Sequence, residues 1–176
     1  AVGNISGAHI NPAVTIAFLV AGRLDRKPAL PYIGCQLIGA TLAAAVLALL
    51  FPQHETLGST LPAVAYWRAF LMEVILSFLL MFVILNVSTG HMEKGIMAGV
   101  AVGGTVAFEA LVGGPVTGAS MNPARSFGPA LVSGHLETLW IYLCAPVLGM
   151  LLARPTCRWI QGSECCAVEA SETEPA

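Results

Sequence analysis

Residues 28–53 carry no charged side chain, and three later stretches of the chain are almost as apolar. These stretches, residues 67–88, 95–112 and 138–153, hold only three charged side chains between them. The hydrocarbon core of a bilayer is about 30 Å thick, a distance that a helix of about 20 residues crosses. The four stretches therefore predict four membrane-spanning helices.

The amino-acid composition also points to a membrane protein. Hydrophobic residues make up 56% of the 176-residue chain and charged residues only 10%, whereas about a quarter of the residues in soluble domains are charged. So few charges cannot cover a soluble surface, and a net charge of −2 offers no basic field for nucleic acid. We predict an all-α membrane protein with one domain over residues 1–160 and a disordered, acidic tail over residues 161–176.

The basic residues predict how the helices are oriented. Lys and Arg are enriched in the cytoplasmic loops of membrane proteins, and residues 51–66 contain neither. The other flanks of the four stretches carry Arg23, Arg26, Lys27, Lys94, Arg154 and Arg158. We therefore expect residues 51–66 to face outward and the C-terminus to lie in the cytoplasm.

Two ten-residue segments repeat one pattern 111 positions apart. SGAHINPAVT (residues 6–15) and TGASMNPARS (residues 117–126) match at Gly, Ala, Asn, Pro and Ala. Each leads into a short apolar segment that ends at Gly22 or Gly134, and ten helical residues reach about 15 Å, half of the hydrocarbon core. An odd number of predicted spans separates the copies, so they enter from opposite faces. We predict an inverted repeat of two re-entrant half-helices that meet at the bilayer midplane.

The Asn-Pro-Ala triplets predict the chemistry of that meeting point. An Asn can cap its own half-helix with its side-chain oxygen and keep its amide N–H groups to donate into the cavity between the two ends. Proline suits the first helical position, and alanine keeps the contact between the tips small. Two positive helix ends at one point repel cations and orient water. The residues with these roles are Asn11, Pro12, Ala13, Asn122, Pro123 and Ala124.

The stretches before the two Asn residues are rich in Gly and Ser. At membrane depth, irregular backbone is tolerated only where it lines a cavity or is buried in protein. We expect both stretches to be extended and to present their carbonyl groups to a pore. These predicted pore carbonyls belong to Gly7, Ala8, His9, Gly118 and Ser120.

The two repeated segments resemble the signature loops of the aquaporin, or major intrinsic protein, family, whose double Asn-Pro-Ala motif is highly specific. The resemblance covers essentially the whole chain. It implies a fold of six spanning helices and two half-helices, of which this chain lacks the first two spanning helices. It also implies a passive channel in the cell membrane that assembles as a homotetramer with one pore in each subunit.

By the same resemblance, Arg125 is the filter arginine near the outer mouth of the pore. Its position also suggests a function, because a cation in the first turn of a helix opposes the helix dipole. The resemblance places two further filter positions at Ala110 and Ala119. Glu73 resembles a buried family glutamate that accepts hydrogen bonds from loop N–H groups.

Two other polar side chains have open roles. Gln36 either supports the first loop in the way expected of Glu73, or it makes a hydrogen bond between two helices. Glu109 adjoins a filter position and either bonds to the outer loop or lines the mouth of the pore.

The filter residues suggest which solutes pass. Narrow water channels of the family typically have His where this chain has Ala110, so we expect a wider and less polar constriction. Glycerol facilitators typically have Asp after the filter arginine, whereas this chain has Ser126, as water channels do. The mixture is similar to the plant nodulin-like intrinsic proteins and their bacterial relatives. We therefore favour water and small uncharged solutes such as glycerol or metalloid hydroxides; the alternatives are a strictly water-selective pore and a nonconducting membrane scaffold.

The sequence gives no indication of an enzyme. It contains no nucleophile with a nearby base, no cluster with metal-ligand spacing and no phosphate-binding loop, so we expect no catalytic residue, metal or cofactor. A proton-coupled transporter would need a titratable group near the two Asn residues, and neither Glu73 nor Glu109 is near them in the sequence.

Overall fold

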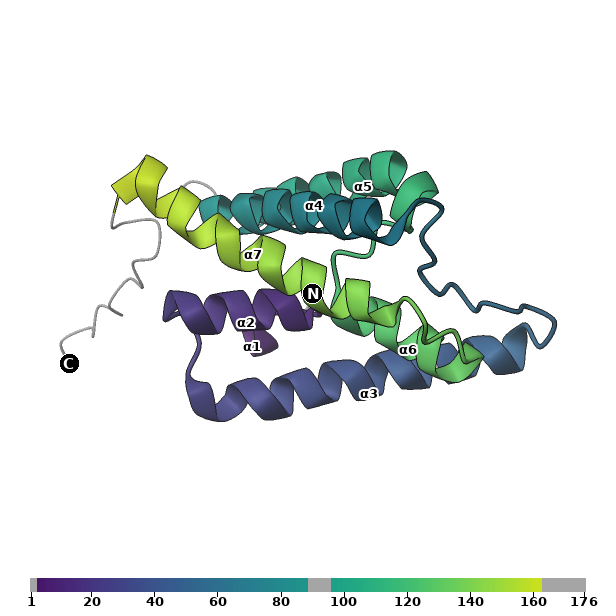
Figure 1. The fold of residues 1–176 in the computed structure, drawn as a ribbon. Helices are drawn as coiled ribbons and strands as arrows, with labels where there is room; N and C mark the ends of the chain where they lie inside the picture. The colour runs from purple at the N-terminus through teal and green to yellow at the C-terminus, as the bar shows by residue number, and fades with distance from the viewer. Residues whose placement is uncertain (1–2, 89–95, 163–176) are drawn as a thin grey trace.

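The computed structural model describes residues 3–88 and 96–162, and every regular element within them is a helix. Four helices are long and apolar enough to cross a membrane, which confirms the four predicted spans. They are α3 (Arg26–Leu50), α4 (Tyr66–Val87), α5 (Ile96–Thr117) and α7 (Leu139–Gln161) (Figure 1). Lys94 and nearly all of the predicted tail lie outside the described residues.

Two of these helices are longer than predicted. α5 continues to Thr117 through Pro115, although the predicted span ends at residue 112. α7 continues to Gln161 through Pro155, although the predicted span ends at residue 153. A proline removes one backbone donor, and membrane helices tolerate this loss where neighbouring groups replace the hydrogen bond. Proline is therefore a poor marker of where an apolar helix ends.

Two short helices lie end to end between the long ones, with their N-termini facing each other (Figure 1). They are α2 (Pro12–Ala21) and α6 (Pro123–Ser133), and each begins directly after the Asn of its Asn-Pro-Ala triplet. Each is followed by a left-handed glycine, Gly22 with φ 78° and Gly134 with φ 82°, a conformation that glycine adopts without strain. The predicted inverted pair of half-helices is confirmed.

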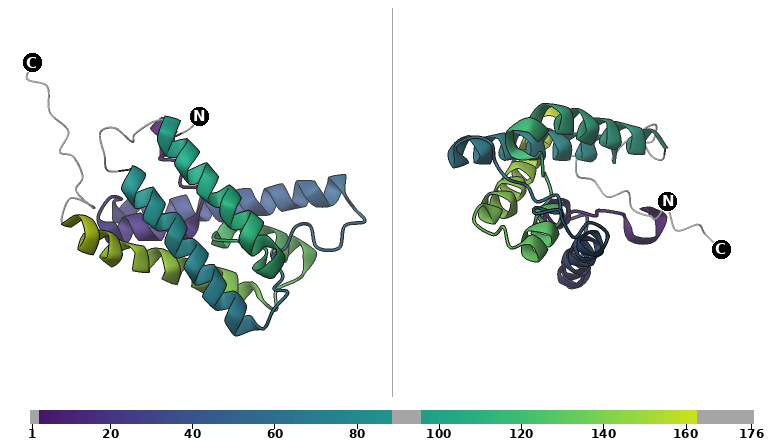
Figure 2. Two further views of the ribbon diagram at one scale, coloured as in Figure 1. Left: turned by 90° about the horizontal axis from the view of Figure 1, so that it is seen from above. Right: turned by 90° about the vertical axis from the view of Figure 1, so that its right-hand side faces the viewer.

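The half-helices lie between two sides of the molecule. α4 and α5 form one side and α3 the opposite side, while α7 runs diagonally past α2 and α6 (Figures 1 and 2). Buried side chains from α2, α4 and α7, including Val14, Leu80 and Met150, form a common core. Only 6% of the apolar window of α3 is buried, against 33% in α4 and 39% in α7. Within the described part of the chain, α3 is thus a peripheral helix, and a single helical turn, α1 (Gly3–Ser6), projects from the body of the molecule (Figure 2).

Candidate functional site

The N-terminal ends of α2 and α6 meet through two reciprocal hydrogen bonds. The amide nitrogen Nδ2 of Asn11 donates to the carbonyl oxygen of Met121 at 2.8 Å. Nδ2 of Asn122 donates to the carbonyl oxygen of Ile10, also at 2.8 Å. The sequence predicted that both side-chain N–H groups of each Asn point into the cavity. In the structure, one N–H group of each amide donates to the opposite loop, and only the other is left for the cavity.

The same two side chains cap the half-helices. Oδ1 of Asn11 accepts from the backbone N–H of Ala13 at 2.9 Å and from that of Val14 at 3.5 Å. Oδ1 of Asn122 accepts in the same way from the backbone N–H of Ala124 at 3.0 Å and from that of Arg125 at 3.3 Å. Each Asn thus satisfies N–H groups that the start of a helix leaves without partners.

The segments that lead into the two Asn residues are not extended, contrary to the prediction. The backbone is left-handed, with positive φ, at Gly7, Ala8, Ile10, Gly118, Ala119 and Met121. The second three positions follow the first three by 111 residues, so the repeat extends to the backbone conformation. A composition rich in Gly and Ser indicates irregular backbone but does not distinguish extended from left-handed residues. Non-glycine residues adopt the left-handed conformation at a cost of about 1–2 kcal/mol each, so other contacts must hold these segments in place.

The predicted pore carbonyls have no partner in the described part of the chain. No hydrogen bond between described residues ends on the carbonyl oxygen of Gly7, Ala8, His9, Gly118 or Ser120. Their role in lining a pore stays a prediction.

Two tyrosines, which the sequence analysis missed, hold the leading segments. The hydroxyl of Tyr32 in α3 donates to the carbonyl oxygen of Ser6 at 2.9 Å. The hydroxyl of Tyr142 in α7 donates to the carbonyl oxygen of Thr117 at 2.6 Å. Ser6 and Thr117 occupy equivalent places, each five residues before its Asn. The signal in the sequence is a tyrosine followed by glycine seven residues later, at Tyr32 and again at Tyr142.

Glu73 of α4 holds the second leading segment from the opposite side. Its side chain is fully buried. Its carboxylate accepts from the N–H of Ser120 at 2.9 Å, from the N–H of Met121 at 2.9 Å and from the hydroxyl of Thr117 at 2.7 Å. Hydrogen bonds to a charged acceptor are stronger than neutral ones, so this side chain fixes the segment next to Asn122.

The first leading segment is held through Thr15 of α2. Nε2 of Gln36 donates to the hydroxyl oxygen of Thr15 at 3.0 Å, which is a hydrogen bond between α3 and α2. Of the two roles considered for Gln36, the structure thus shows the bond between helices. The hydroxyl of Thr15 donates to the carbonyl oxygen of Asn11 at 3.1 Å, and Nδ1 of His9 lies 3.1 Å from the same hydroxyl.

Arg125 in the first turn of α6 reaches the loop between α3 and α4. Its Nη1 donates to the carbonyl oxygen of Gly58 at 2.7 Å, and the side chain is exposed. The same loop contributes Thr60, whose hydroxyl donates to the hydroxyl oxygen of Ser126 at 2.7 Å. Gly58 and Thr60 therefore belong to the site, and nothing in the repeat pattern could have identified them.

The two other predicted filter residues lie in different surroundings. Ala119 is buried and belongs to the core cluster that contains Leu76 of α4. Ala110 lies on α5 with its side chain exposed. No hydrogen bond or core cluster within the described residues joins either of them to Arg125, so a filter made of these three residues stays a prediction.

Glu109 is buried without a partner. Its side chain is 1% exposed, and neither carboxylate oxygen has a hydrogen-bond partner within the described part of the chain. The loop over residues 51–65 is described in full, so the proposed bond from Glu109 to that loop is not present.

An open cavity of about 590 Å³ lies beside the junction, between α3 and the start of α6. Its lining includes Tyr32, Gln36, Gly39, Asn122 and Arg125. The positions 110 residues later on α7 are Tyr142, Pro146 and Gly149, and all three are buried. Gly149 packs against the backbone of α4. The face of α7 that α4 covers thus corresponds to the face of α3 that borders this cavity.

Comparison with known proteins identifies similar chains. A family model described as MIP, major intrinsic protein, matches residues 1–155. Aquaporin NIP1-1 of Zea mays is 49% identical over 150 residues, which cover 85% of this chain and 53% of that protein. Nodulin-26 of Glycine max is 49% identical over 151 residues, covering 85% of this chain and 56% of that protein. The chain thus spans about half the length of the curated relatives it matches.

A solved structure shows the same architecture. The X-ray structure of the aquaglyceroporin from Plasmodium falciparum is similar with a TM-score of 0.77 and 25% sequence identity. The match covers 86% of this chain and 72% of the solved chain.

Proposed function

The chain belongs to the major intrinsic protein family, and on that premise we propose that it works in a passive channel for water and small uncharged solutes. We favour glycerol and metalloid hydroxides as solutes and expect protons and ions to be excluded. Its relatives are aquaporins, which are channels and not enzymes.

The observation that carries the proposal is the pair of reciprocal hydrogen bonds that Asn11 and Asn122 make. It holds two helix N-termini against each other, and their positive ends disfavour a cation at that point. The second N–H of each amide remains available to a permeating oxygen. A solute that accepts hydrogen bonds can exchange partners there, whereas a cation would lose its hydration without compensation.

The small side chains of Ala110 and Ala119 support the choice of solute. Neither side chain offers a hydrogen bond or much bulk, so Arg125 is the polar group of the proposed filter. Such a constriction is wider and less polar than one containing His. The similarity to nodulin-26 and to an aquaglyceroporin agrees with this choice.

We place the channel in the cell membrane as a multi-pass protein with a cytoplasmic C-terminus, assembled as a homotetramer with one pore in each subunit. In the complete channel, a further spanning helix covers the open face of α3 as α4 covers α7. The cavity beside Asn122 and Arg125 is the place for that helix. Without such a cover, the pore would open sideways into lipid.

Stopped-flow light scattering of vesicles tests the proposal. The chain is joined to the first two spanning helices of a nodulin-like relative, and an inward glycerol gradient is applied. We expect fast shrinkage followed by fast reswelling, with reswelling lost in Ala110→His while shrinkage persists. Arg125→Val and empty vesicles serve as controls for the filter and for lipid permeability.

Three outcomes bear on the alternatives. Fast shrinkage without reswelling above the empty control would show a water-selective pore. Neither phase above the control, in a chain that folds, would favour a nonconducting scaffold. A proton current that accompanies glycerol uptake in the unmodified channel would contradict the proposed exclusion of protons.

A further inference from the structure

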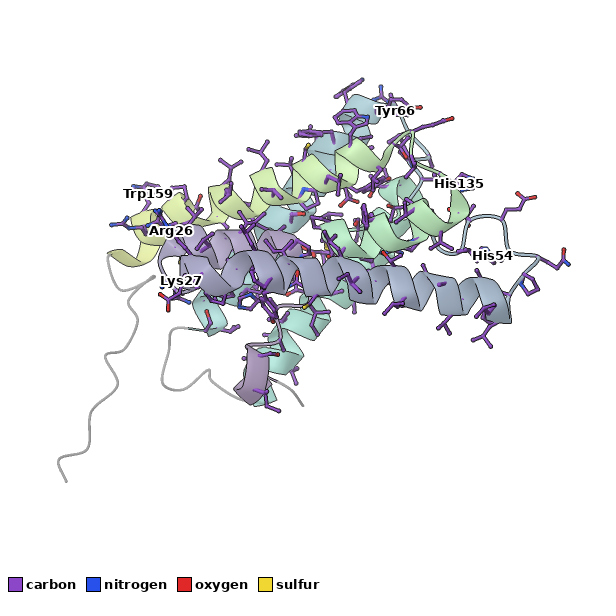
Figure 3. All side chains as sticks on the ribbon, turned by 90° about the horizontal axis from the view of Figure 1, so that it is seen from below. Arg26, Lys27, His54, Tyr66, His135 and Trp159 are labelled. Carbon is purple, nitrogen blue, oxygen red and sulfur yellow. The ribbon has the colours of Figure 1, made fainter. Side chains whose placement is uncertain are left out.

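One end of the molecule carries most of its basic side chains. Figure 3 shows Arg26, Lys27 and Trp159 at this end, and Tyr66, His54 and His135 toward the other. Arg154 and Arg158 belong to the last two turns of α7 and lie near Trp159. We call this the basic end; it is the end that the distribution of Lys and Arg predicts to face the cytoplasm.

A pocket of about 380 Å³ lies at the basic end on the surface of α7. It is lined by Arg154, Pro155, Arg158 and Trp159, so two guanidinium groups and an indole surround one space. Trp159 is 87% exposed. An exposed indole beside charged groups is typical of the interface between lipid headgroups and hydrocarbon, where its apolar ring and its N–H are both satisfied.

Arg154 is the unusual member of this pocket. Its Nε atom is shielded from solvent and has no hydrogen-bond partner within the described part of the chain. A guanidinium carries five N–H donors, and leaving a buried donor unsatisfied is unfavourable. The remaining N–H donors of Arg154 and those of Arg158 make no hydrogen bond within the described residues, so an acceptor that enters the pocket would bind to these donors.

We propose that this pocket binds the phosphate of an anionic phospholipid in the leaflet at the basic end. The planar guanidinium group of an arginine pairs with two oxygens of a phosphate through parallel N–H···O bonds, and this pocket offers two such groups. Basic pockets at the cytoplasmic ends of spanning helices suit anionic headgroups in this way. Trp159 packs against the glycerol backbone of the same lipid, which a soluble phosphate does not possess.

Two general effects also favour basic residues here, but they do not account for the pocket. A cation in the last turn of a helix complements the helix dipole, and basic loops orient membrane proteins. Both effects would be served equally by a solvated lysine. Neither explains an arginine with a shielded, unpartnered Nε next to an exposed tryptophan.

Native mass spectrometry of the whole chain in neutral detergent tests the proposal by counting bound lipids. The probe is phosphatidylglycerol, with phosphatidylcholine as the uncharged comparison. Because each basic side chain near an anionic headgroup contributes about 1 kcal/mol, we expect Arg158→Gln to weaken phosphatidylglycerol binding about fivefold. The double variant Arg154→Gln, Arg158→Gln is expected to weaken it roughly 25-fold.

The matched control is Arg68→Gln. Arg68 also lies beside a tryptophan, with its guanidinium carbon 5.2 Å from the ring of Trp67, but in the first turn of α4 at the opposite end. We expect this variant to bind phosphatidylglycerol as the unmodified chain does. Arg158 is exposed, so its replacement leaves the fold intact, and the melting temperature checks this for each variant.

Several results would overturn the proposal. Equal binding of both lipids by the unmodified chain would contradict the preference for an anionic headgroup. Equal losses of phosphatidylglycerol binding in Arg68→Gln and Arg158→Gln would contradict the assignment of the lipid to this pocket. Displacement of the lipid by sn-glycerol 3-phosphate at the same concentration would assign the pocket to a soluble phosphate. A tenfold gain in lipid binding after removal of residues 163–176, which contain four glutamates, would show that the tail occupies the pocket. None of these readouts depends on conduction, so failure here is distinct from failure of the proposed channel function.

Discussion

Asn11 and Asn122 each donate a 2.8 Å hydrogen bond to the carbonyl oxygen of the residue directly before the other. Both side chains also cap their own half-helices. Each amide is therefore fixed at its oxygen by one half-helix and at its nitrogen by the opposite loop. A shift of either half-helix would break hydrogen bonds in both halves of the junction.

The first prediction concerns this coupling. Asn11→Ser keeps a side chain that caps helices well but is too short to reach Met121. We expect the free energy of unfolding to fall by about 1–3 kcal/mol, because a buried carbonyl loses its donor. Asn122→Ser should lose less, because its acceptor is the carbonyl of exposed Ile10, where water can replace the bond, and the double variant should lose less than the sum of the two. Denaturant unfolding in detergent micelles, followed by tryptophan fluorescence, measures all three.

The decisive quantity is the difference between the summed stability losses of the two single variants and the loss in the double variant. Two bonds that fix the same junction should show an interaction energy of about 0.5–3 kcal/mol. Losses that add within the experimental error would mean that each Asn acts only on its own half-helix.

The second prediction separates two buried glutamates. Glu73 accepts three hydrogen bonds, whereas Glu109 makes none with the described residues. Glu73→Gln should lower the free energy of unfolding by about 2–3 kcal/mol, because an amide has one acceptor oxygen and turns its NH₂ group toward backbone donors. Glu109→Gln is the matched control and should leave stability unchanged or raise it, since a lone carboxyl group is costly to bury.

Unfolding of both variants under the same conditions measures this difference. Hydrogen exchange adds a local readout, because the N–H groups of Ser120 and Met121 should exchange faster in Glu73→Gln alone. Equal loss of stability in the two variants would show that burial, and not the hydrogen bonds to the loop, determines the effect.

The third prediction compares the two tyrosines. Tyr142→Phe leaves the carbonyl of Thr117 without its donor in a fully buried place, and we expect a loss of about 1–3 kcal/mol. Tyr32→Phe removes the equivalent bond to Ser6 and the bond that the same hydroxyl accepts from the N–H of His9. Both lie at a half-buried place where water can replace them, so about 0.5–1 kcal/mol should be lost. Losses in the opposite order would show that burial of the hydrogen bond does not determine how much each tyrosine hydroxyl contributes.

Much of the fold was predictable because its signals are local. α3 and α4 begin and end within three residues of the apolar stretches that predicted them. The half-helices begin at Asn-Pro and end at glycine, and both signals act on the backbone of neighbouring residues. The ends of α5 and α7 were not predictable, since the cost of Pro115 or Pro155 depends on which groups surround it.

The site was predictable only in part, for a related reason. The repeat identifies Asn11 and Asn122, but their mutual hydrogen bonds need the three-dimensional arrangement. Tyr32 lies 26 residues from Ser6, and Arg125 lies 67 residues from Gly58. The repeated Tyr and Gly spacing marks Tyr32 and Tyr142 but does not give their partners, and nothing in the spacing pairs Arg125 with Gly58. The left-handed residues before each Asn are hidden because alanine and methionine usually avoid that conformation.

The last prediction concerns the contact between α4 and α7 that holds the second leading segment in place. A Cβ atom added at Gly149 would clash with the carbonyl oxygen of Val74, and it would lie 3.0 Å from the backbone nitrogen of Phe78. Backbone cannot yield as a flexible side chain can, so Gly149→Ala must push the two helices apart. We expect a net loss of about 1–3 kcal/mol in the free energy of unfolding, as for other overpacked cores.

Gly99→Ala in α5 is the matched control, because a Cβ atom there meets nothing within 4 Å in the described part of the chain. Both substitutions gain the same helix propensity, about 0.5–1 kcal/mol, so the control should be stabilised by that amount. The difference between the two variants therefore isolates the close approach of α7 to α4. Since α7 carries Tyr142 and α4 carries Glu73, Gly149→Ala should also speed hydrogen exchange at Ser120 and Met121. A variant that unfolds like Gly99→Ala and keeps slow exchange at those amides would show that the helices do not approach as closely as the structure has them.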